Sequence, residues 1–427
     1  MKFQLTAAVA LALSPCVIAD SKQNTKWTDI KSRGKDEDDA PYLVKVLKSN
    51  TRVRVPKGTT LNIATAMNTT SLFGTHLRLE GTLRVKPDFA YWAGNAFAVP
   101  YQKNSAIWLF GGENIVMDGG GTIDGKQYSI KSKPLAKCWK GSGQSWWDAR
   151  PGNVSLIPPL TLVVHQAHNV RISNITFYKT PKWANLVQES SDVTYEFITV
   201  NSVSNSAADM RETDGWDTYR SDGITIRDSV IHNGDDCVSF KPNSTNIVVR
   251  NLQCTESHGI SVGSLGEIPG VMDIVRNVYV DNIWMSKSEN GVRIKTFAGQ
   301  NRGYGIVDNI IYTNFHNDDN DYPITIDNCY KTSVANCTTY PSGIKINDVF
   351  LRNITGTSSG KYNTTVASLV CSPGACGPVY LQDINISPPS NYSAASYTCL
   401  NLNVTGPSAS LFNCTSGDVT GSPYPPA

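Results

Sequence analysis

The sequence lacks the features of several common protein classes. Its 38 basic and 36 acidic side chains leave a formal net charge of only +2, so no field of the whole protein attracts nucleic acid or an acidic surface. Its ten cysteines include no CxxC pair, and no HxxxH pair is present, which argues against a zinc site. We therefore expect no nucleic-acid partner and no zinc site, and an anionic ligand would need a local basic cluster.

Helical and hairpin patterns are also scarce. No segment between the short apolar stretches keeps a 3.6-residue apolar period, which argues against an α/β fold. The turn signals that an antiparallel sandwich needs about every 8 to 12 residues are missing as well. What remains for a chain of 427 residues with 40% apolar content is one elongated β domain or a repeat.

Short β-branched stretches recur with the same shape, and each alternates apolar and polar residues as a strand does. They are NVRISNITF from 169, DVTYEFITV from 192, GITIRDSVI from 223, NIVVRNLQC from 246, NVYVDNIWM from 277, NIIYTNF from 309 and DVFLRNITG from 348. Their starts are 23, 31, 23, 31, 32 and 39 residues apart. A minimum period near 23 with loop insertions is typical of a solenoid. We predict an all-β fold, a single-domain right-handed parallel β-helix over residues 20–427.

The first 19 residues, MKFQLTAAVALALSPCVIA, combine one Lys, an apolar run and small residues at Val17 and Ala19. This pattern predicts a secretory signal peptide cleaved before Asp20. A membrane anchor is the competing interpretation, but the run is shorter than the ~20 residues needed to span. Eleven N-x-S/T sequons support export to the extracellular space. These glycosylation candidates are Asn68, Asn153, Asn174, Asn243, Asn336, Asn353, Asn363, Asn385, Asn391, Asn403 and Asn413.

Nine cysteines remain once Cys16 leaves with the signal peptide, and in an oxidising compartment most of them should form disulfides. Close spacing suggests four pairs, although sequence alone does not prove connectivity. The suggested pairs are Cys237 with Cys254, Cys329 with Cys337, Cys371 with Cys376 and Cys399 with Cys414. Cys138 is left over.

Acidic residues gather between 212 and 246, where seven carboxylates face only three basic side chains. In a β-helix, residues one coil apart lie in neighbouring strands, ~4.8 Å from each other. Asp214 and Asp235 are 21 residues apart, and Asp236 and His258 are 22 apart. Three successive coils should therefore present Asp214, the Asp235/Asp236 pair and His258 on one wall.

Adjacent strand residues point to opposite faces, so Asp235 and Asp236 serve one cleft only if they lie at a turn, which Asn233 and Gly234 would provide. Stacked Asn or Asp ladders that only satisfy the backbone are the competing interpretation. Three acids stacked beside a His, however, raise at least one pKa. Glycosidic hydrolysis requires one protonated and one ionised acid.

A basic pair, Arg293 and Lys295, follows on one face of a predicted strand, one coil and an insertion after His258. Alone it would suggest a solvated surface pair. Beside stacked acids it suggests a clamp for a sugar carboxylate, because a guanidinium binds such a group bidentately.

With these residues the chain resembles the polygalacturonases of glycoside hydrolase family 28. The family motifs NTD, GDD, GHG and RIK correspond to ETDG at 212–215, GDDC at 234–237, SHGIS at 257–261 and RIK at 293–295. The resemblance extends to GGGTIDGKQYS from 119 and GQSWWDARP from 143. TDGWDTYRSD and NGDDCVSFKPNSTN are most similar to the fungal exo-acting members, which release galacturonic acid from the non-reducing end of pectic chains.

The resemblance implies a role for each matching residue. It makes Asp235 the general acid, Asp214 and Asp236 the water-activating carboxylates, and His258 a supporting residue. It makes Arg293, Lys295 and Tyr330 the substrate-binding residues. It also implies a secreted inverting hydrolase without metal or cofactor. Its partner would be a pectic polysaccharide, and we expect it to act as a monomer. Insertions such as residues 126–160 would close one end of the cleft.

Two departures and one tension qualify the match. Glu212 replaces the motif Asn, and we expect it to be neutralised by Arg211, to turn away, or to mark a changed substrate. Ser257 replaces the first Gly of GHG, a mild change if its backbone torsion is ordinary. A one-coil gap also lies nearer the ~5 Å carboxylate separation of retaining enzymes than the ~6.5–9.5 Å of inverting ones.

Three other functions compete. An exo-hydrolase of rhamnogalacturonan or xylogalacturonan would accept a neutral or branched sugar. A pectate-lyase-like β-helix would need a calcium cluster and a basic proton abstractor, which GDD and the following HG disfavour. A non-catalytic pectin-binding solenoid would be explained by Glu212.

Overall fold

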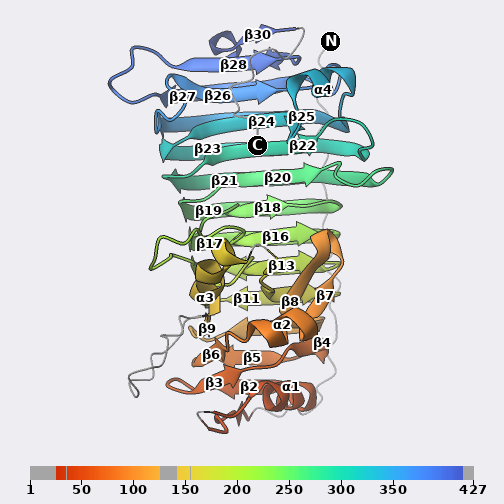
Figure 1. The fold of residues 1–427 in the computed structure, drawn as a ribbon, viewed down its shortest axis with the longest axis vertical. Coiled ribbons are helices and arrows are strands. Elements are labelled where there is room, and N and C mark those ends of the chain that lie inside the picture. The colour runs from red at the N-terminus through yellow and green to blue at the C-terminus, as the bar shows by residue number, and fades with distance from the viewer. Residues whose placement is uncertain (1–25, 35, 126–141, 154, 417–427) are drawn as a thin grey trace, which may run out of the picture.

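The computed structural model describes residues 26–34, 36–125, 142–153 and 155–416, so the predicted signal peptide at 1–19 and Cys138 lie outside the described residues. All of its described strands join one continuous sheet. Within those ranges every strand pairing is parallel except that of β7 with β8. The sheet winds upward coil by coil (Figure 1), and the predicted all-β parallel β-helix is confirmed.

Each coil contributes strands to up to three faces. One face, called the site face below, consists of β4 (Met67–Phe73), β8 (Asn104–Asp118), β10 (Leu160–His165), β13 (Asn185–Gln188), β16 (Trp216–Tyr219), β18 (Val238–Phe240), β20 (Ile260–Leu265), β22 (Asn290–Phe297), β24 (Tyr322–Tyr330), β26 (Thr365–Val370), β28 (Ser396–Leu400) and β30 (Asn413–Thr415).

The second face consists of β1 (Thr28–Asp29), β2 (Arg52–Val55), β5 (His76–Leu79), the end of β8, β11 (His168–Ser173), β14 (Ser191–Glu196), β17 (Ser221–His232), β19 (Ser244–Thr255), β21 (Met272–Ser286), β23 (Tyr304–Asn320), β25 (Gly343–Ser358), β27 (Val379–Ser387) and β29 (Val404–Thr405). The third starts with β3 (Thr60–Ile63), β6 (Thr82–Val85), β9 (Thr122–Asp124), β12 (Thr176–Tyr178) and β15 (Thr199–Asn201). It continues into the ends of β17 and later long strands.

The repeat seen in the sequence is the bend between the second and third faces. Paired residues there keep the predicted spacings, as in Val193 with Ile224 and Ile224 with Ile247. Each bend contains a residue with a φ near +50°, such as Asn251 and Asn282, a conformation that Asn tolerates. The Asn282 amide donates to the side-chain oxygen of Asn251 at 2.8 Å. The Asn ladder considered above therefore exists, on this bend.

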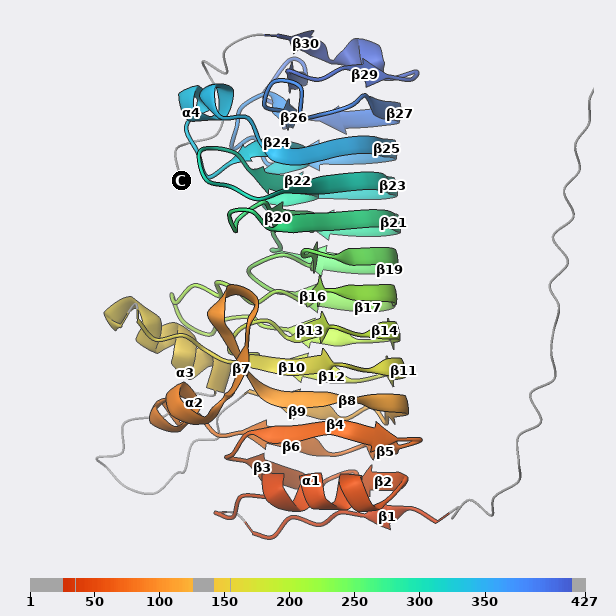
Figure 2. The same cartoon turned by 90° about the vertical axis from the view of Figure 1, so that its right-hand side faces the viewer.

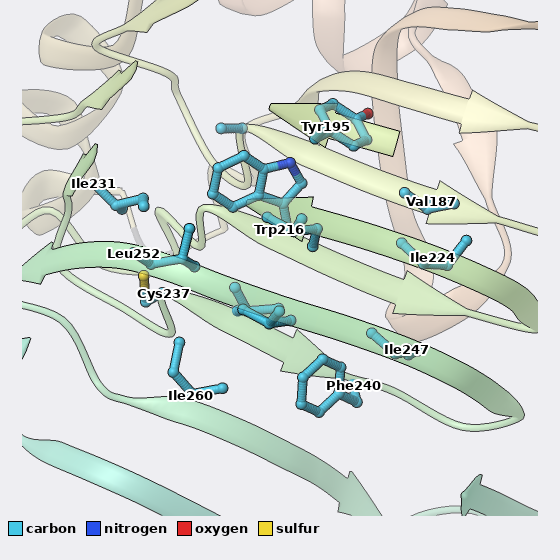
Figure 3. Close-up of a cluster of buried hydrophobic side chains, with 14 of the residues drawn as sticks. Val187, Tyr195, Trp216, Ile224, Ile231, Cys237, Phe240, Ile247, Leu252 and Ile260 are labelled. Atoms are coloured by element: carbon cyan, nitrogen blue, oxygen red, sulfur yellow. The ribbon is translucent and has the colours of Figure 1, made fainter. Parts of the chain in front are cut away.

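The core lies inside the coil, where alternate strand residues point. Trp216, Phe240 and Ile260 from successive coils of the site face are fully buried and pack against Ile224 and Ile247 of the second face (Figure 3). Cys237 and Cys254 form a disulfide in this core. The pairs Cys329 with Cys337, Cys371 with Cys376 and Cys399 with Cys414 are also bonded, so all four suggested pairings are confirmed.

Helices occupy the ends and the side of the coil. α1 (Ala40–Ser49) lies across the first coil and buries Leu43 and Leu47 on the core. β7 (Phe97–Val99), α2 (Phe89–Asn95) and α3 (Ser142–Ala149) protrude on one side next to β10, and α4 (Val334–Thr339) lies further up that side (Figure 2). The short helices η1 (Tyr101–Lys103), η2 (Arg150–Gly152) and η3 (Ala409–Leu411) complete the list. Among the described helices, none is long and apolar enough to cross a membrane.

Candidate functional site

Strand register brings the predicted site residues together. Trp216 pairs with Val238, and Val238 with Ile260. Two positions earlier, this register places Asp214, Asp236 and His258 in one column where the chain enters the site face. Ser261 pairs with Arg293, and Gly263 with Lys295, so the basic pair occupies the next coil on the same face.

The predicted turn before β18 is confirmed. Residues 233–237 form a bend in which the buried Asn233 amide donates to the carbonyls of Thr213, Asp235 and Asp236. Gly234 passes so close to the previous coil that a Cβ would lie 2.8 Å from Met210 Cβ. The bend allows both aspartates to face the same site.

Three carboxylates form the centre of the site. Asp214, Asp235 and Asp236 each place one oxygen within 4.8 Å of the other two. Asp214 and Asp236 are only 2% and 1% exposed, whereas the Asp235 side chain retains 21% exposure. Asp235 is therefore the member of the cluster that solvent or a sugar reaches most easily.

Asp235 is held by both of its oxygens. Its Oδ1 lies 3.2 Å from His258 Nδ1 and accepts the Asp236 amide at 2.8 Å. Its Oδ2 accepts the Glu212 amide at 3.0 Å. The resemblance makes His258 a supporting residue, and the structure places its imidazole against Asp235.

Asp236 is bound to the predicted basic pair. Lys295 Nζ donates to its Oδ2 at 2.7 Å, Ser261 Oγ donates to its Oδ1 at 2.6 Å, and Arg293 Nη1 lies 3.9 Å away. Tyr330 lies on the far side of Lys295, whose Nζ is 6.0 Å from the ring centre. In the site as it stands, Lys295 is directed at a carboxylate of the protein itself.

Burial and neighbouring charge move the pKa values in opposite directions. Burial, then Asp217 and Asp235, raise the pKa of Asp214 well above its usual range. Burial also opposes the ionisation of Asp235 and Asp236, but the pKa values of both acids are lowered. His258 and Lys295 together outweigh burial at Asp235. Lys295, Lys241 and Arg293 together outweigh it at Asp236. Burial lowers the pKa of His258, and Asp235 reverses this to a net rise. These shifts favour protonation of Asp214 and His258 over protonation of Asp235 and Asp236.

The site face is closed on the N-terminal side of the cluster. Outward-facing Leu186 is the register neighbour of Asp217, and Val163 is the neighbour of Leu186. These side chains are covered by Val99 and Tyr101 of the β7–η1 segment, in a buried cluster with Ala106, Leu160 and Trp183. A ligand lying along the site face therefore meets an apolar wall next to the carboxylates.

Comparison with known proteins identifies the family. The model of glycosyl hydrolases family 28 matches residues 47–410. An exopolygalacturonase of Cochliobolus carbonum is 38% identical over 87% of this chain and 83% of its own length. Exopolygalacturonase X-1 of Emericella nidulans is 36% identical over 93% of this chain and 90% of its own. The chain belongs to glycosyl hydrolases family 28.

Solved structures agree with the fold of this family 28 chain. The endo-xylogalacturonan hydrolase of Aspergillus tubingensis superposes with a TM-score of 0.80 at 28% identity, over 92% of this chain and all of the other. The polygalacturonase of Erwinia carotovora superposes with a TM-score of 0.68 at 21% identity over 91% of this chain and 98% of the other, and so supports the fold only.

The two departures from the family motifs have different consequences. Ser257 has no positive φ, and its hydroxyl donates to the Asp235 carbonyl at 2.9 Å, so the Gly-to-Ser change is structurally mild. Glu212 has a φ of +55°, a conformation that suits Asn better than Glu. Its carboxylate lies 3.2 Å from Arg150 and 3.4 Å from Lys182. Arg211 pairs with Asp209 instead, so the expected neutralisation by Arg211 is wrong.

Several residues of the site were missed in the sequence. Glu289 lies 3.6 Å from His258 Nε2 and 3.3 Å from Arg293, and so bridges them. Lys241 and Asp217 form a buried pair beneath the cluster. The motifs alone do not indicate Lys241. An alignment of the site-face strands by their register, which puts Lys241 beside Gly263, would have indicated it.

Proposed function

We propose that this chain is an exo-acting hydrolase that releases galacturonic acid from the non-reducing end of polygalacturonate. The observation that carries the proposal is the cluster of Asp214, Asp235 and Asp236, within 4.8 Å, with His258 on one acid and Lys295 on another. The names of the exopolygalacturonases that share 38% and 36% identity support the same substrate.

The cluster suits a single-step displacement. In this mechanism Asp214 and Asp236 bind one water, and one of them takes its proton as the water oxygen bonds to the anomeric carbon. The glycosidic C–O bond breaks, and Asp235 delivers a proton to the departing oxygen. One water enters, one bond is broken, and the anomeric configuration inverts.

The acid role of Asp235 requires a proton, although His258 and Lys295 lower the pKa of Asp235. His258 Nδ1 lies 3.2 Å from Asp235 Oδ1, so an imidazolium there can return the proton once a sugar covers the 21% of Asp235 that is exposed. Excluding water disfavours a separated charge pair and favours the neutral one. His258 then acts as the source from which Asp235 is loaded.

The short gap between the acids is accommodated by the pair of bases. One oxygen from each of the three acids lies within 4.8 Å of the other two. This approach is closer than the ~6.5–9.5 Å separation of the two carboxyl groups in most inverting enzymes. We infer that two carboxylates holding one water from adjacent coils work at shorter range than one base would. The anomer formed first decides this point.

The closed end of the site face favours exo action. Tyr101 is 6% exposed in the wall cluster and stacks on Tyr219, with ring centres 4.4 Å apart. A polymer cannot extend through a packed apolar wall, so only a chain end reaches the acids. We infer that the 97–103 segment, together with α3, ends the cleft.

A second candidate is exo-hydrolysis of xylogalacturonan. The polymer is suggested by the 0.80 TM-score of an endo-xylogalacturonan hydrolase. It is also suggested by Glu212, whose carboxylate pairs with Lys182 and Arg150. Because Glu212 already neutralises Arg150 and Lys182, these cations would not require a negatively charged sugar as their ligand.

The assay that tests the proposal uses polygalacturonate and xylogalacturonan in parallel. Reducing ends, product size and the absorbance of unsaturated ends are followed together. Monogalacturonate from polygalacturonate, without unsaturated products, supports the proposal. Preference for the xylosylated polymer transfers the assignment to the second candidate, and unsaturated ends would indicate a lyase.

Export remains part of the proposal. Four disulfides suit an oxidising compartment, and all eleven sequon asparagines are exposed or half-buried. We infer that the chain is secreted, glycosylated and active as a monomer on a pectic polysaccharide. Mass spectrometry of the secreted protein would identify the N-terminus and the sequons in use.

A further inference from the structure

A buried ammonium lies beneath the carboxylate cluster. Lys241 immediately follows β18 and is 5% exposed. Its Nζ lies 3.1 Å from Asp217 Oδ1, 3.9 Å from Asp214 Oδ2 and 4.0 Å from Asp236 Oδ2, and donates to the Gly263 carbonyl at 3.2 Å. The Lys241 ammonium therefore lies within 4.0 Å of three different carboxylates.

Stability alone does not account for this pair. Asp217 is fully buried, and a buried ion pair is often no more stable than apolar residues of the same volume. The same outward column is apolar one coil earlier, at Leu186. The change from Leu186 to Asp217 occurs in the coil that also contributes Asp214.

Asp214 and Asp236 lie in adjacent coils and repel each other when both are ionised. Lys295 bonds to Asp236, and Lys241 lies within 4.0 Å of both acids. The other charged or titratable groups facing Lys241 are Asp217 and the Tyr101 phenol, and the ring of Trp183 lies 5.2 Å from Nζ. Lys241 is thus placed to reduce the repulsion between the two bases.

We propose that Lys241, anchored by Asp217, is a positioning residue that makes it easier to ionise Asp214 beside Asp236 and directs both carboxylates at the same water. The inference rests on the proposed function, since it concerns the bases of that hydrolysis. Lys241 touches no reacting atom and acts only through the two carboxylates.

The titration of the neighbours supports this role. Burial raises the pKa of Asp214 and opposes the ionisation of Asp236, and Lys241 acts against burial at both acids. Removal of the Lys241 ammonium should therefore make both bases harder to ionise.

The kinetic test compares Lys241→Met, Lys241→Arg and the exposed control Lys57→Met on a short oligogalacturonate across pH 3 to 8. We expect Lys241→Met to lower kcat about 100-fold with KM changed less than about 3-fold, and to move the acidic limb of kcat upward by about one pH unit. In Lys241→Arg, the acidic limb of kcat should return most of the way to its wild-type position on the pH axis. An unchanged limb, or a raised KM at constant kcat, would overturn the proposal.

A second comparison needs no activity and keeps the proposal testable if Lys241→Met fails to fold or the wild type is inert on polygalacturonate. Asp217→Asn and Asp217→Asn/Lys241→Met both lack the Asp217 carboxylate and differ only in the ammonium. Without it, Asp214 and Asp236 ionise less readily in the folded state, so the double variant should lose Tm relative to Asp217→Asn as pH rises from 4 to 8. Parallel Tm curves would overturn the inference, whereas an inert wild type overturns only the proposed function.

Discussion

Asp235 and His258 are the pair on which the chemistry depends at the scale of single residues. Asp235 is the most exposed of the three acids and is bonded to the histidine, while Asp214 and Asp236 are buried. An acid that donates to a sugar must be reachable, and bases that bind a small water need not be. Exposure therefore supports the same division of roles as the motif resemblance.

Asp235→Asn should lower kcat on polygalacturonate by at least about 100-fold, since general acid catalysis contributes 10²–10⁴-fold. The Asn side chain keeps the size of Asp and one acceptor oxygen, which can serve either the Glu212 or the Asp236 amide, so the fold should be retained with at most a small loss of Tm. A 4-nitrophenyl galacturonide, whose leaving group needs no proton, should lose much less. Equal losses on both substrates, or more than about a tenth of wild-type activity on the polymer, would remove Asp235 from the acid role.

Glu212 occupies the position at which the family motif has Asn. Its φ of +55° disfavours a non-Gly, non-Asn residue by roughly 1 kcal/mol, and its carboxylate occupies Arg150 and Lys182. We expect Glu212→Asn to lower KM for polygalacturonate by freeing these cations and to leave Tm unchanged or slightly higher. Glu212→Gln keeps the length without the charge and separates the two effects. An unchanged KM in both variants would show that the two cations do not bind substrate.

Much of the site could be predicted at this scale. Asp214, Asp236 and His258 recur at almost one coil length, so a repeat and a carboxylate pattern are enough to group them. The partners of Glu212 could not be predicted, because Arg150 comes from an insertion of no regular period. Lys241 was missed because a single Lys after an apolar strand has no motif.

Secondary-structure elements determine which end of the cleft is open. The predicted wall was the insertion at 126–160, of which α3 and η2 are described and Arg150 reaches Glu212. The packed wall itself includes β7 and η1, an element that the sequence did not indicate. Its contacts with Trp183 and Leu186 are long-range, and no local periodicity encodes them.

Tyr101→Ala should loosen this wall. Removing a buried aromatic ring lowers the free energy of unfolding by about 3–5 kcal/mol. The loss should fall on the β7–η1 segment, which Tyr101 anchors. We expect short oligogalacturonates among the early products and a faster fall in viscosity, measured by chromatography and viscometry. Phe73→Ala, which removes a ring that is 68% exposed on β4, serves as the control. A product pattern that stays purely monomeric would show that the wall does not determine exo action.

The whole molecule is the scale at which the sequence was most informative. Seven strands at irregular but insertion-like spacings were enough to predict the β-helix, since the bend residues repeat in every coil. The site-face strands were not predicted individually, because short apolar segments such as VSF at β18 carry little periodicity. α1 was missed too, because its apolar pattern lies before the repeat begins.

Stability should be greatest at mildly acidic pH. Burial raises the pKa of Asp217 to about 7 and that of Asp327 to about 6, from 3.8, so the folded state binds extra protons and loses stability as pH rises through this range. The pKa values of Asp235 and Asp236 are lowered, so stability also falls as pH drops below 3.8. We expect Tm to peak near pH 4 and to fall from there toward pH 7.

Asp327→Asn isolates one of these contributions. The Asn oxygen can still accept the Cys329 amide, which Asp327 Oδ1 accepts at 2.9 Å, so packing should be preserved. The fall of Tm between pH 4 and 7, measured by differential scanning fluorimetry, should become shallower in this variant. A Tm that rises steadily to pH 8 in the wild type would contradict the account of the buried acids.

The central claim is that these three acids hydrolyse an α-linked galacturonate from the chain end with inversion. Proton NMR of polygalacturonate during the first minutes of reaction tests it most directly, because the anomer and the size of the product are observed before mutarotation. The account predicts that the β anomer of monogalacturonate appears first, and that it forms at least about 100-fold more slowly with Asp235→Asn. Early appearance of the α anomer, or of oligomers in place of the monomer, would contradict it.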